Sequence, residues 1–201
     1  MSALPKPRKL TPIEYLALEE AAEFKSEYHN GEMFAMAGAS GNHAFINNNL
    51  VGELASRLKG GPCRTASNDL RMKVEEIGLY TYPDLIIICG KPEFDPLSKN
   101  TLINPAVVFE ILSPSTASYD RGAKFRMYQK RATIREIVLV SQEEPLIQVF
   151  TRQDNGSWSL NTFDDMSGSF SLMTLPVIVP LVDVYRDVEF DSQEPSEPER
   201  E

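Results

Sequence analysis

The chain has 201 residues, which suits a domain of ordinary size with a buried core. Hydrophobic residues make up 42% and charged residues 24% of it, a balance that excludes a disordered or fibrous chain. The longest apolar run, residues 85–89, is far too short for a membrane helix, and the basic N-terminus lacks the apolar core of a secretory signal. Two cysteines, Cys63 and Cys89, are too few for a disulfide framework or a zinc cage. We therefore expect no membrane insertion and a reducing, cytoplasmic location.

The net charge of −9 is unevenly distributed. Residues 191–201 carry five acidic groups and one basic group, a net charge of −4, which leaves −5 for residues 1–190. The last segment is rich in Glu, Pro and Ser and has no apolar residue, so we expect a disordered acidic tail after a single domain, residues 1–190. An acidic domain does not bind phosphate polymers tightly by charge alone.

The first half of the chain predicts two helices separated by a hairpin. Thr11, Pro12 and Glu14 form a capping-box pattern that opens a helix over residues 12–22. Asn30-Gly31 lies between two short runs, which is typical of a β-hairpin within residues 24–37. Ser40 is positioned to cap a second amphipathic helix, which continues to residue 59 and ends at Gly60.

The remaining elements alternate between strands and one more helix. Residues 69–75 alternate in polarity, which predicts a half-buried strand. Apolar strands, a helix and a hairpin around residues 154–156 follow: strands 85–89, 106–112 and 136–140, helix 118–131, and hairpin strands 146–152 and 157–163. This order predicts an α/β fold with a mixed central sheet flanked by helices and additional antiparallel hairpins.

Two carboxylates stand out because they accompany apolar strands. Glu110 lies inside the run 106–112, where an unpaired carboxylate would be strongly destabilising. Asp84 precedes the strand 85–89, so the two groups lie close together if these strands are neighbours. Either Glu110 pairs with an arginine, or the two carboxylates bind a hard cation such as Mg²⁺, which takes one or two carboxylates together with phosphate oxygens.

A combination of motifs carries a family resemblance. Tyr82-Pro83-Asp84, the segment Phe109 to Thr116, Asp120 and Lys124 resemble the Uma-two family of bacterial endonucleases, within the PD-(D/E)xK restriction-endonuclease-like superfamily. The resemblance extends from about Leu10 to Val188 and includes the hairpin Glu27 to Met36, His43, and Arg135-Glu136. One residue departs from the superfamily pattern: Leu112 stands where the motif has lysine.

The resemblance implies metal-dependent hydrolysis of a nucleic-acid phosphodiester, with DNA as the expected partner. Asp84, Glu110 and the Ile111 carbonyl would bind Mg²⁺ or Mn²⁺. Lys124, on the following helix, would replace the missing strand lysine and stabilise developing charge. Without the resemblance, a surface ion pair with Asp120 is the default interpretation of Lys124.

Other polar residues are candidates for supporting roles. His43 and Glu32 could lie around the carboxylates, although a lone histidine is more often a hydrogen-bonded core or cap residue. Asp69 could reach the site or remain a solvated acid at a strand end. Asp120 would stand one helical turn before Lys124, and Tyr128 is interpreted as a packing residue.

Three functions remain open on the sequence. The first is a DNA endonuclease, which the family resemblance suggests acts as a homodimer. The second is an inactive nuclease fold that serves as a binding or regulatory module, which the acidic domain and Leu112 favour. The third is a glycosidase-like hydrolase using two carboxylates, for which the single tryptophan, Trp158, offers little support.

Overall fold

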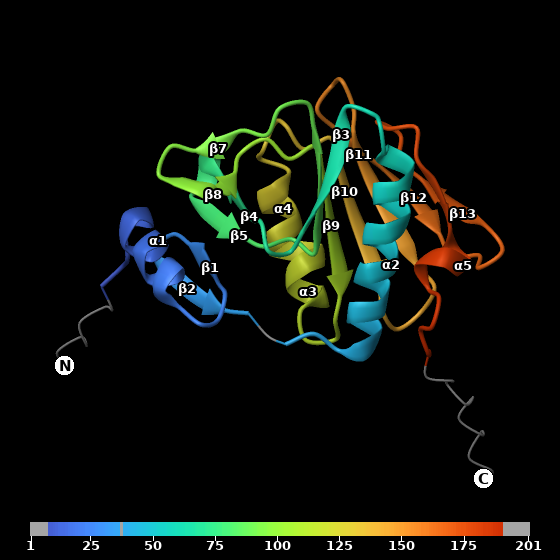
Figure 1. The fold of residues 1–201 in the computed structure, drawn as a ribbon, viewed down its shortest axis with the longest axis horizontal. Coiled ribbons are helices and arrows are strands. Elements are labelled where there is room, and N and C mark those ends of the chain that lie inside the picture. Colours follow the sequence, from blue (N-terminus) through green and yellow to red (C-terminus); the bar gives the residue numbers. More distant parts are fainter. Residues whose placement is uncertain (1–7, 37, 191–201) are drawn as a thin grey trace, which may run out of the picture.

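The computed structural model describes residues 8–36 and 38–190; the tail predicted to be disordered, residues 191–201, lies outside them. Within the described residues the strands form two six-stranded sheets and one two-stranded sheet. We call the six-stranded sheets the central sheet and the first sheet. Figure 1 shows the two side by side, with α3 and α4 between them and α2 against the other face of the central sheet, away from the first sheet. The predicted mixed α/β architecture is confirmed.

The central sheet is built from the apolar strands. β9 and β10 are parallel and all other neighbours are antiparallel. Both faces are covered, which explains why β6, β9 and β10 read as continuous hydrophobic runs. The spatial order is β12 (Trp158–Phe163), β11 (Ile147–Arg152), β10 (Glu136–Ser141), β9 (Val107–Leu112), β6 (Leu85–Cys89) and β3 (Cys63–Ser67).

Alternate residues of the central strands enter two separate cores. Phe109 and Ile111 of β9 pack with α2 (Gly41–Leu58) and α5 (Leu181–Val184). Val108 and Leu112 face the other way, toward the first sheet and Tyr128. Since side chains alternate along a strand, Glu110 shares the face of Val108 and Leu112. That face is where the candidate site forms.

The first sheet is made of shorter and more polar strands. β4 and β8 are parallel and the other neighbours are antiparallel. The spatial order is β2 (Glu32–Ala35), β1 (Ser26–His29), β5 (Leu79–Thr81), β4 (Arg71–Val74), β8 (Ser98–Leu102) and β7 (Phe94–Asp95). A 3₁₀ turn, η1 (Glu75–Ile77), separates β4 from β5.

The N-terminal helix and hairpin agree with their predictions. The helix α1 (Pro12–Ala21) has the Thr11–Glu14 capping box and ends one residue earlier than expected. Asn30 and Gly31 both have positive φ, 51° and 94°, as the tight turn between β1 and β2 requires. A buried aromatic cluster of Tyr15, Tyr28 and Tyr80 joins α1, β1 and β5. This cluster packs α1 against strands β1 and β5 of the first sheet.

The predicted helix at residues 118–131 is wrong in its geometry. It consists of α3 (Ala117–Tyr119), the π-helical turn η2 (Asp120–Lys124) and α4 (Phe125–Tyr128). In the π turn the Phe125 N–H donates to the Asp120 carbonyl, one residue further back than in an α-helix. Such turns are frequent at functional sites.

Several elements were not predicted from the sequence. β3 (CRTAS) and β8 (SKNTL) have no hydrophobic run, and β5, β7, β13 (Ser169–Ser171) and β14 (Ile178–Pro180) have only two or three residues each. The strand predicted at residues 69–75 begins only at Arg71, and it is not half-buried, because the Arg71 side chain is buried as well.

Cys63 and Cys89 form a disulfide between the neighbouring strands β3 and β6. The two residues stand directly opposite each other in the register. Their number had argued against a disulfide framework, and a single bond is not one, but the pairing itself was not predicted. The two cysteines meet only because β3, which has no strand pattern of its own, pairs with β6.

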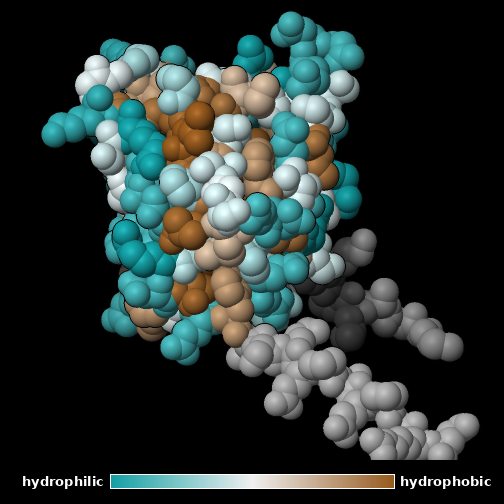
Figure 2. Space-filling model, turned by 90° about the vertical axis from the view of Figure 1, so that its right-hand side faces the viewer, coloured by the Kyte–Doolittle hydropathy of each residue, from teal (hydrophilic) through white to brown (hydrophobic). Residues whose placement is uncertain are grey.

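The C-terminal elements form the face shown in Figure 2, on which polar and apolar residues are interleaved. β13 and β14 pair with each other and pack beside α5, which lies against α2. Large apolar side chains on these elements are exposed, including Leu160, Ile178 and Val182. Across the described residues, no helix is long and apolar enough to cross a membrane.

Candidate functional site

Asp84 and Glu110 lie on adjacent antiparallel strands. β6 and β9 pair with Leu85 opposite Phe109, so Asp84 and Glu110 are opposite each other one residue further on. The Asp84 Oδ2 atom accepts a hydrogen bond of 2.7 Å from the Ile111 N–H. Glu110 is almost fully buried. The predicted proximity of the two carboxylates is therefore present in the structure.

Lys124 reaches the same place from the π turn. Its Nζ atom lies 3.0 Å from Glu110 Oε1, 3.0 Å from Glu27 Oε1 and 3.8 Å from Asp120 Oδ1. The side chain is buried, so the interpretation as a surface ion pair with Asp120 is wrong. The strand has Leu112 where the motif has lysine, but the ammonium group of Lys124 lies beside the carboxylates.

Two hydroxyl groups connect the acidic residues around Lys124. Tyr128 donates a hydrogen bond to Glu110 Oε1, the oxygen that Lys124 contacts, so it does more than pack. Thr81 donates a hydrogen bond to Glu27 Oε1, and its hydroxyl is 3.5 Å from that of Tyr128. Glu27 comes from β1, which pairs with β5 next to Thr81. The first sheet thereby contributes a carboxylate to a site whose other members come from the central sheet and the helical segments.

His43 contacts Asp84 from the first turn of α2. Its Nε2 atom is 3.2 Å from Asp84 Oδ1. Burial lowers the pKa of His43, but the hydrogen bond and charge of Asp84, together with the charge of Asp120, leave the pKa above its usual value. His43 is therefore placed to orient Asp84, as a residue next to the carboxylates.

Negative charge is in excess at this site. Burial raises the pKa of Glu110 well above its usual value; Lys124 opposes this rise, while Asp84 and Asp120 add to it. Burial likewise raises the pKa of Asp120. Burial alone would lower the pKa of Lys124, but Glu110, Tyr128, Glu27 and Asp120 raise it well above its usual value. The crowded carboxyl groups are arranged to attract a further cation.

These groups line a pocket of about 480 Å³, within the size range of small-ligand sites, roughly 300–1,000 Å³. Apolar and aromatic side chains form much of its wall. The lining residues are Glu27, His29, Phe34, Ala35, Met36, Gly38, Ala39, Ser40, His43, Asn68, Tyr82, Asp84, Glu110, Ile111, Ser113, Thr116, Tyr119, Asp120, Lys124 and Met127.

The donor set fits a hard divalent cation. Glu110 Oε2 accepts no hydrogen bond from the described residues, which leaves one carboxylate oxygen available. In an extended strand the N–H and C=O of a residue point to the same edge, so the Ile111 carbonyl points toward the edge where Asp84 lies. Pro83 would stand opposite Ile111 if the pairing continued, and it has no N–H to donate to that carbonyl.

In the described part of the chain, no group of three or more His, Cys, Asp or Glu side chains is arranged to hold a metal ion. Mg²⁺ does not require such a cluster, because it is commonly held by one or two carboxylates, with waters and phosphate oxygens completing its shell. Asp84, Glu110 and the Ile111 carbonyl suit that mode of binding.

Two of the candidate supporting residues lie outside the pocket lining. Glu32 is exposed on β2, and its strand partner is His29. Asp69 lies in the turn before β4 and forms an exposed ion pair with Lys25, because the strand starts two residues later than expected. Of the two interpretations left open for Asp69, the structure shows the solvated acid, and the expectation that Glu32 lies around the carboxylates is wrong.

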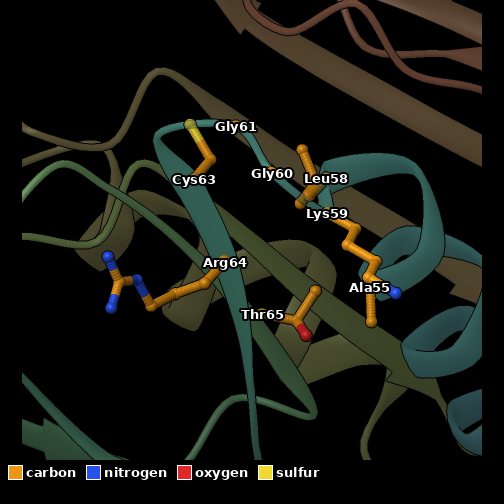
Figure 3. A pocket seen from close by; sticks show the side chains of 8 residues that line it. All are labelled: Ala55, Leu58, Lys59, Gly60, Gly61, Cys63, Arg64 and Thr65. Atoms are coloured by element: carbon orange, nitrogen blue, oxygen red, sulfur yellow. The ribbon is translucent and has the colours of Figure 1, made fainter.

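A second cavity, of about 290 Å³, lies at the C-terminal end of α2 and the start of β3 (Figure 3). Figure 3 shows Arg64 and Thr65 pointing to opposite sides of β3, as neighbouring strand residues do. The lining holds Lys59 and Arg64 but no carboxylate or histidine. Because it has no carboxylate or histidine to bind a hard cation or to act as a general base, we place the candidate chemistry in the acidic pocket.

Comparison with known proteins shows the family to which the chain belongs. Residues 12–184 match the model of the Uma2 family, whose description is "Putative restriction endonuclease". The chain is 34% identical over 182 residues to the protein slr1290 of Synechocystis sp., covering 90% of this chain and 94% of that one. It is 32% identical over 151 residues to sll1609 of the same organism, covering 75% and 85%.

A solved structure shares the fold. It is described as a putative nuclease belonging to DUF820 from Anabaena variabilis, and it superposes with a TM-score of 0.70 over 86% of this chain and 95% of that chain. The identity is 21%, so this likeness supports the architecture and not the individual site residues.

Proposed function

The chain belongs to the Uma2 family of restriction-endonuclease-like proteins, and from that premise we propose that it is a metal-dependent endonuclease that hydrolyses DNA phosphodiester bonds. The observation that carries the proposal is the buried contact of Lys124 with Glu110, beside Asp84 and open to a pocket. A carboxylate pair and a lysine at one pocket support this proposal, because together they could hold a metal ion and a phosphate.

Asp84, Glu110 and the Ile111 carbonyl would hold Mg²⁺ or Mn²⁺. When bound, the ion would supply a Lewis acid for the phosphate and lower the pKa of a water molecule. Hydrolysis then adds water across one P–O bond, leaving a phosphate on one strand end and a hydroxyl on the other.

The protein's own residues would stabilise the reacting phosphate. Lys124 presents a fixed positive charge to the oxygen atoms on which negative charge develops. Glu27 and Tyr128 hold the lysine and Glu110 in place. His43 would hold Asp84 through its contact with Oδ1.

The alternative is a nuclease fold that has lost catalysis and acts as a binding or regulatory module. Leu112 is the residue that favours it, because the strand position for the motif lysine is apolar. The position of Lys124 weighs against it, because its Nζ atom contacts three carboxylates, Glu27, Glu110 and Asp120, at the wall of a pocket that a substrate can enter.

Cleavage assays test the proposal directly. Plasmid DNA, single-stranded DNA and RNA are incubated with the protein in Mg²⁺, Mn²⁺ or a chelator. We expect DNA cleavage that requires the metal and is lost in Asp84→Asn but retained in Asp154→Asn, a variant of an exposed turn aspartate. Absence of cleavage under every condition, or equal cleavage by both variants, would contradict the proposal.

Metal binding has a readout independent of cleavage. A cation that binds only the folded state raises the melting temperature, so Mn²⁺ or Mg²⁺ should stabilise the wild type. We expect Glu110→Gln to abolish this rise and Glu143→Gln, which changes an exposed glutamate, to retain it. Equal rises in both variants would place the metal elsewhere.

Two further parts of the proposal are a homodimer and a cytoplasmic location. A two-fold dimer would present two sites to the two strands of DNA. Sedimentation equilibrium of the purified protein measures the association state, and a concentration-independent monomer would exclude the dimer. Fractionation of cells of the source organism measures the location.

A further inference from the structure

The reacting groups of the proposed site lie deep in the acidic pocket. Glu110, Asp120 and Lys124 are each only 4–6% exposed. A phosphate reaches them by entering the pocket, not by resting on an open surface. The backbone of an intact duplex is held rigidly by its paired and stacked bases, whereas an unpaired nucleotide can leave the stack and enter a pocket.

The aromatic ring of Phe34 lies beside Glu27, one of the carboxylates that contact Lys124. Phe34 lies directly opposite Glu27 in the β1–β2 hairpin, so the two side chains are neighbours on one face. Phe34 lines the pocket and is 50% exposed. A partly exposed phenylalanine one residue pair from the Glu27–Lys124 contact provides a flat apolar surface close to where a phosphate would bind.

A second ring lines the pocket from the helical side. Tyr119 directly precedes Asp120, and it is 40% exposed. Burial and the charge of Glu27 raise the pKa of its hydroxyl, in keeping with a position beside the acidic cluster. The hairpin and α3 therefore each contribute an aromatic side chain to the pocket.

Positive charge for gripping a long backbone is scarce at this pocket. Among its lining residues Lys124 is the single lysine or arginine, and it is occupied by carboxylates. Binding that depends on neutralising many phosphates is therefore disfavoured here. Stacking of a base on an aromatic ring does not depend on such charges.

We infer that the pocket accepts one unpaired nucleotide of a DNA strand, with its base stacked on Phe34 and Tyr119 and its phosphate beside Lys124. This inference rests on the proposed function, and it specifies the form of the substrate. Single strands, loops and frayed ends bind in preference to a fully paired duplex.

Binding measurements test the inference without cleavage. The probe is a fluorescein-labelled twelve-nucleotide oligothymidylate, alone or paired with its complement, and anisotropy is measured in Ca²⁺ in place of Mg²⁺. We expect the single strand to bind at least roughly tenfold tighter than the duplex. Phe34→Ala should weaken single-strand binding by roughly 5- to 150-fold, the range for one stacked base, and leave duplex binding unchanged.

Matched variants separate stacking from other effects. Phe24→Ala removes a phenylalanine that is 79% exposed and lies outside the pocket lining, so it should bind like the wild type. Tyr119→Phe keeps the ring and should retain binding, whereas Tyr119→Ala should weaken it. Melting temperatures of all four variants in chelator verify that each is folded.

The outcomes separate this inference from the proposed function. Equal affinity for strand and duplex, or equal effects of Phe34→Ala and Phe24→Ala, would overturn the inference, even if the protein cuts DNA. Tight, Phe34-dependent binding of the strand supports the inference even if no DNA is cut, in which case the proposed catalytic activity fails instead.

Discussion

Two buried clusters in this protein have the same three components and different surroundings. In the first sheet, Lys73 Nζ lies 2.9 Å from Asp95 Oδ2, and Tyr80 donates a hydrogen bond of 3.1 Å to the same oxygen. In the candidate site, Lys124 Nζ lies 3.0 Å from Glu110 Oε1, to which Tyr128 also donates. The two triads of lysine, carboxylate and tyrosine are chemically alike.

The pKa values of their two carboxyl groups nevertheless shift in opposite directions. Burial raises the pKa of Asp95, but hydrogen bonds from the Leu97 N–H and Lys73 outweigh it, so the pKa is lowered. Burial also raises the pKa of Glu110, and there Asp84 and Asp120 add to the rise. The Asp95 triad is satisfied within itself, whereas the Glu110 triad has spare negative charge. The difference shows that a site is marked by charge imbalance, not by the residue types alone.

The largest expected effect is on catalysis, at the triad of Lys124, Glu110 and Tyr128. Lys124→Met keeps much of the apolar stem and removes the charge, so the cleavage rate should fall by about 10²–10³-fold, the scale for losing one preorganised stabiliser. Metal-induced stabilisation should persist, because Asp84 and Glu110 remain. Steady-state cleavage rates measure this.

The control for this variant is Lys130→Met, which alters an exposed lysine in the same segment. Its rate should match that of the wild type. If both variants cut DNA equally fast, Lys124 has no part in the reaction.

Substitutions in the triad of Lys73, Asp95 and Tyr80 should change the stability of the fold instead. Asp95→Asn removes the charged partner of Lys73, and we expect the free energy of unfolding to fall by about 2–3 kcal/mol, less than for a fully buried pair because Lys73 is partly exposed. Glu110→Gln leaves Lys124 with Glu27 as a charged partner 3.0 Å away and relieves repulsion among the acids, so in chelator the free energy of unfolding should fall by less than in Asp95→Asn. Urea titrations of both variants measure the contrast. A larger loss from Glu110→Gln would reverse our assignment of the two clusters.

The sequence identifies part of the candidate site because some residues conflict with their local pattern. Glu110 is conspicuous as an acid within an apolar strand, and Asp84 borders the neighbouring strand. Glu27 gives no such signal, because the short strand β1 (SEYH) has no apolar run in which an acid would be conspicuous. Only its distant pairing with β5 brings it to Lys124. Asp69 and Glu32 show the converse limit: both acids lie near predicted elements, and only the strand boundary of β4 and the exposure of β2 show that they stay outside the pocket.

The fold shows the same limit. Long periodic segments such as α2, β9 and the β11–β12 hairpin were predictable because their hydrophobic pattern matches their structure. β3 was not, since the residues CRTAS carry no strand pattern of their own and are ordered by pairing with β6. The π turn at Asp120–Lys124 was also hidden, because local propensity does not distinguish it from an α-helix.

A smaller effect is expected in the pH dependence of stability. The raised pKa of Glu110 means that the folded state keeps a proton that the unfolded chain loses near pH 4.5, so stability falls as the pH rises from there toward the folded pKa. His43, with its pKa raised above 6.5, adds a loss at higher pH. The lowered pKa of Asp95 gives stability that is present above pH 3.8 and lost as the pH falls through the folded pKa.

Melting temperatures measured in chelator across this range test these opposite slopes. Glu110→Gln should flatten the decline on the side of rising pH, and Asp95→Asn should flatten the loss in acid. If each variant instead flattened the other slope, the contrast between the triads would be wrong.

The smallest expected effects are at the exposed acids. Asp69→Asn breaks an ion pair with Lys25 in which the Asp69 side chain is 81% exposed, and such pairs contribute about 0–1 kcal/mol. Glu32→Gln alters an exposed residue on the same hairpin as Glu27. Neither side chain lines the pocket, so the cleavage rates of both variants should stay within about twofold of the wild type. Glu27→Gln removes a charge held 3.0 Å from Lys124 and should lower the cleavage rate measurably. Since Glu27 and Glu32 belong to one hairpin and differ chiefly in which of them faces Lys124, equal rates for their two variants would show that contact with the lysine does not decide which carboxylates matter.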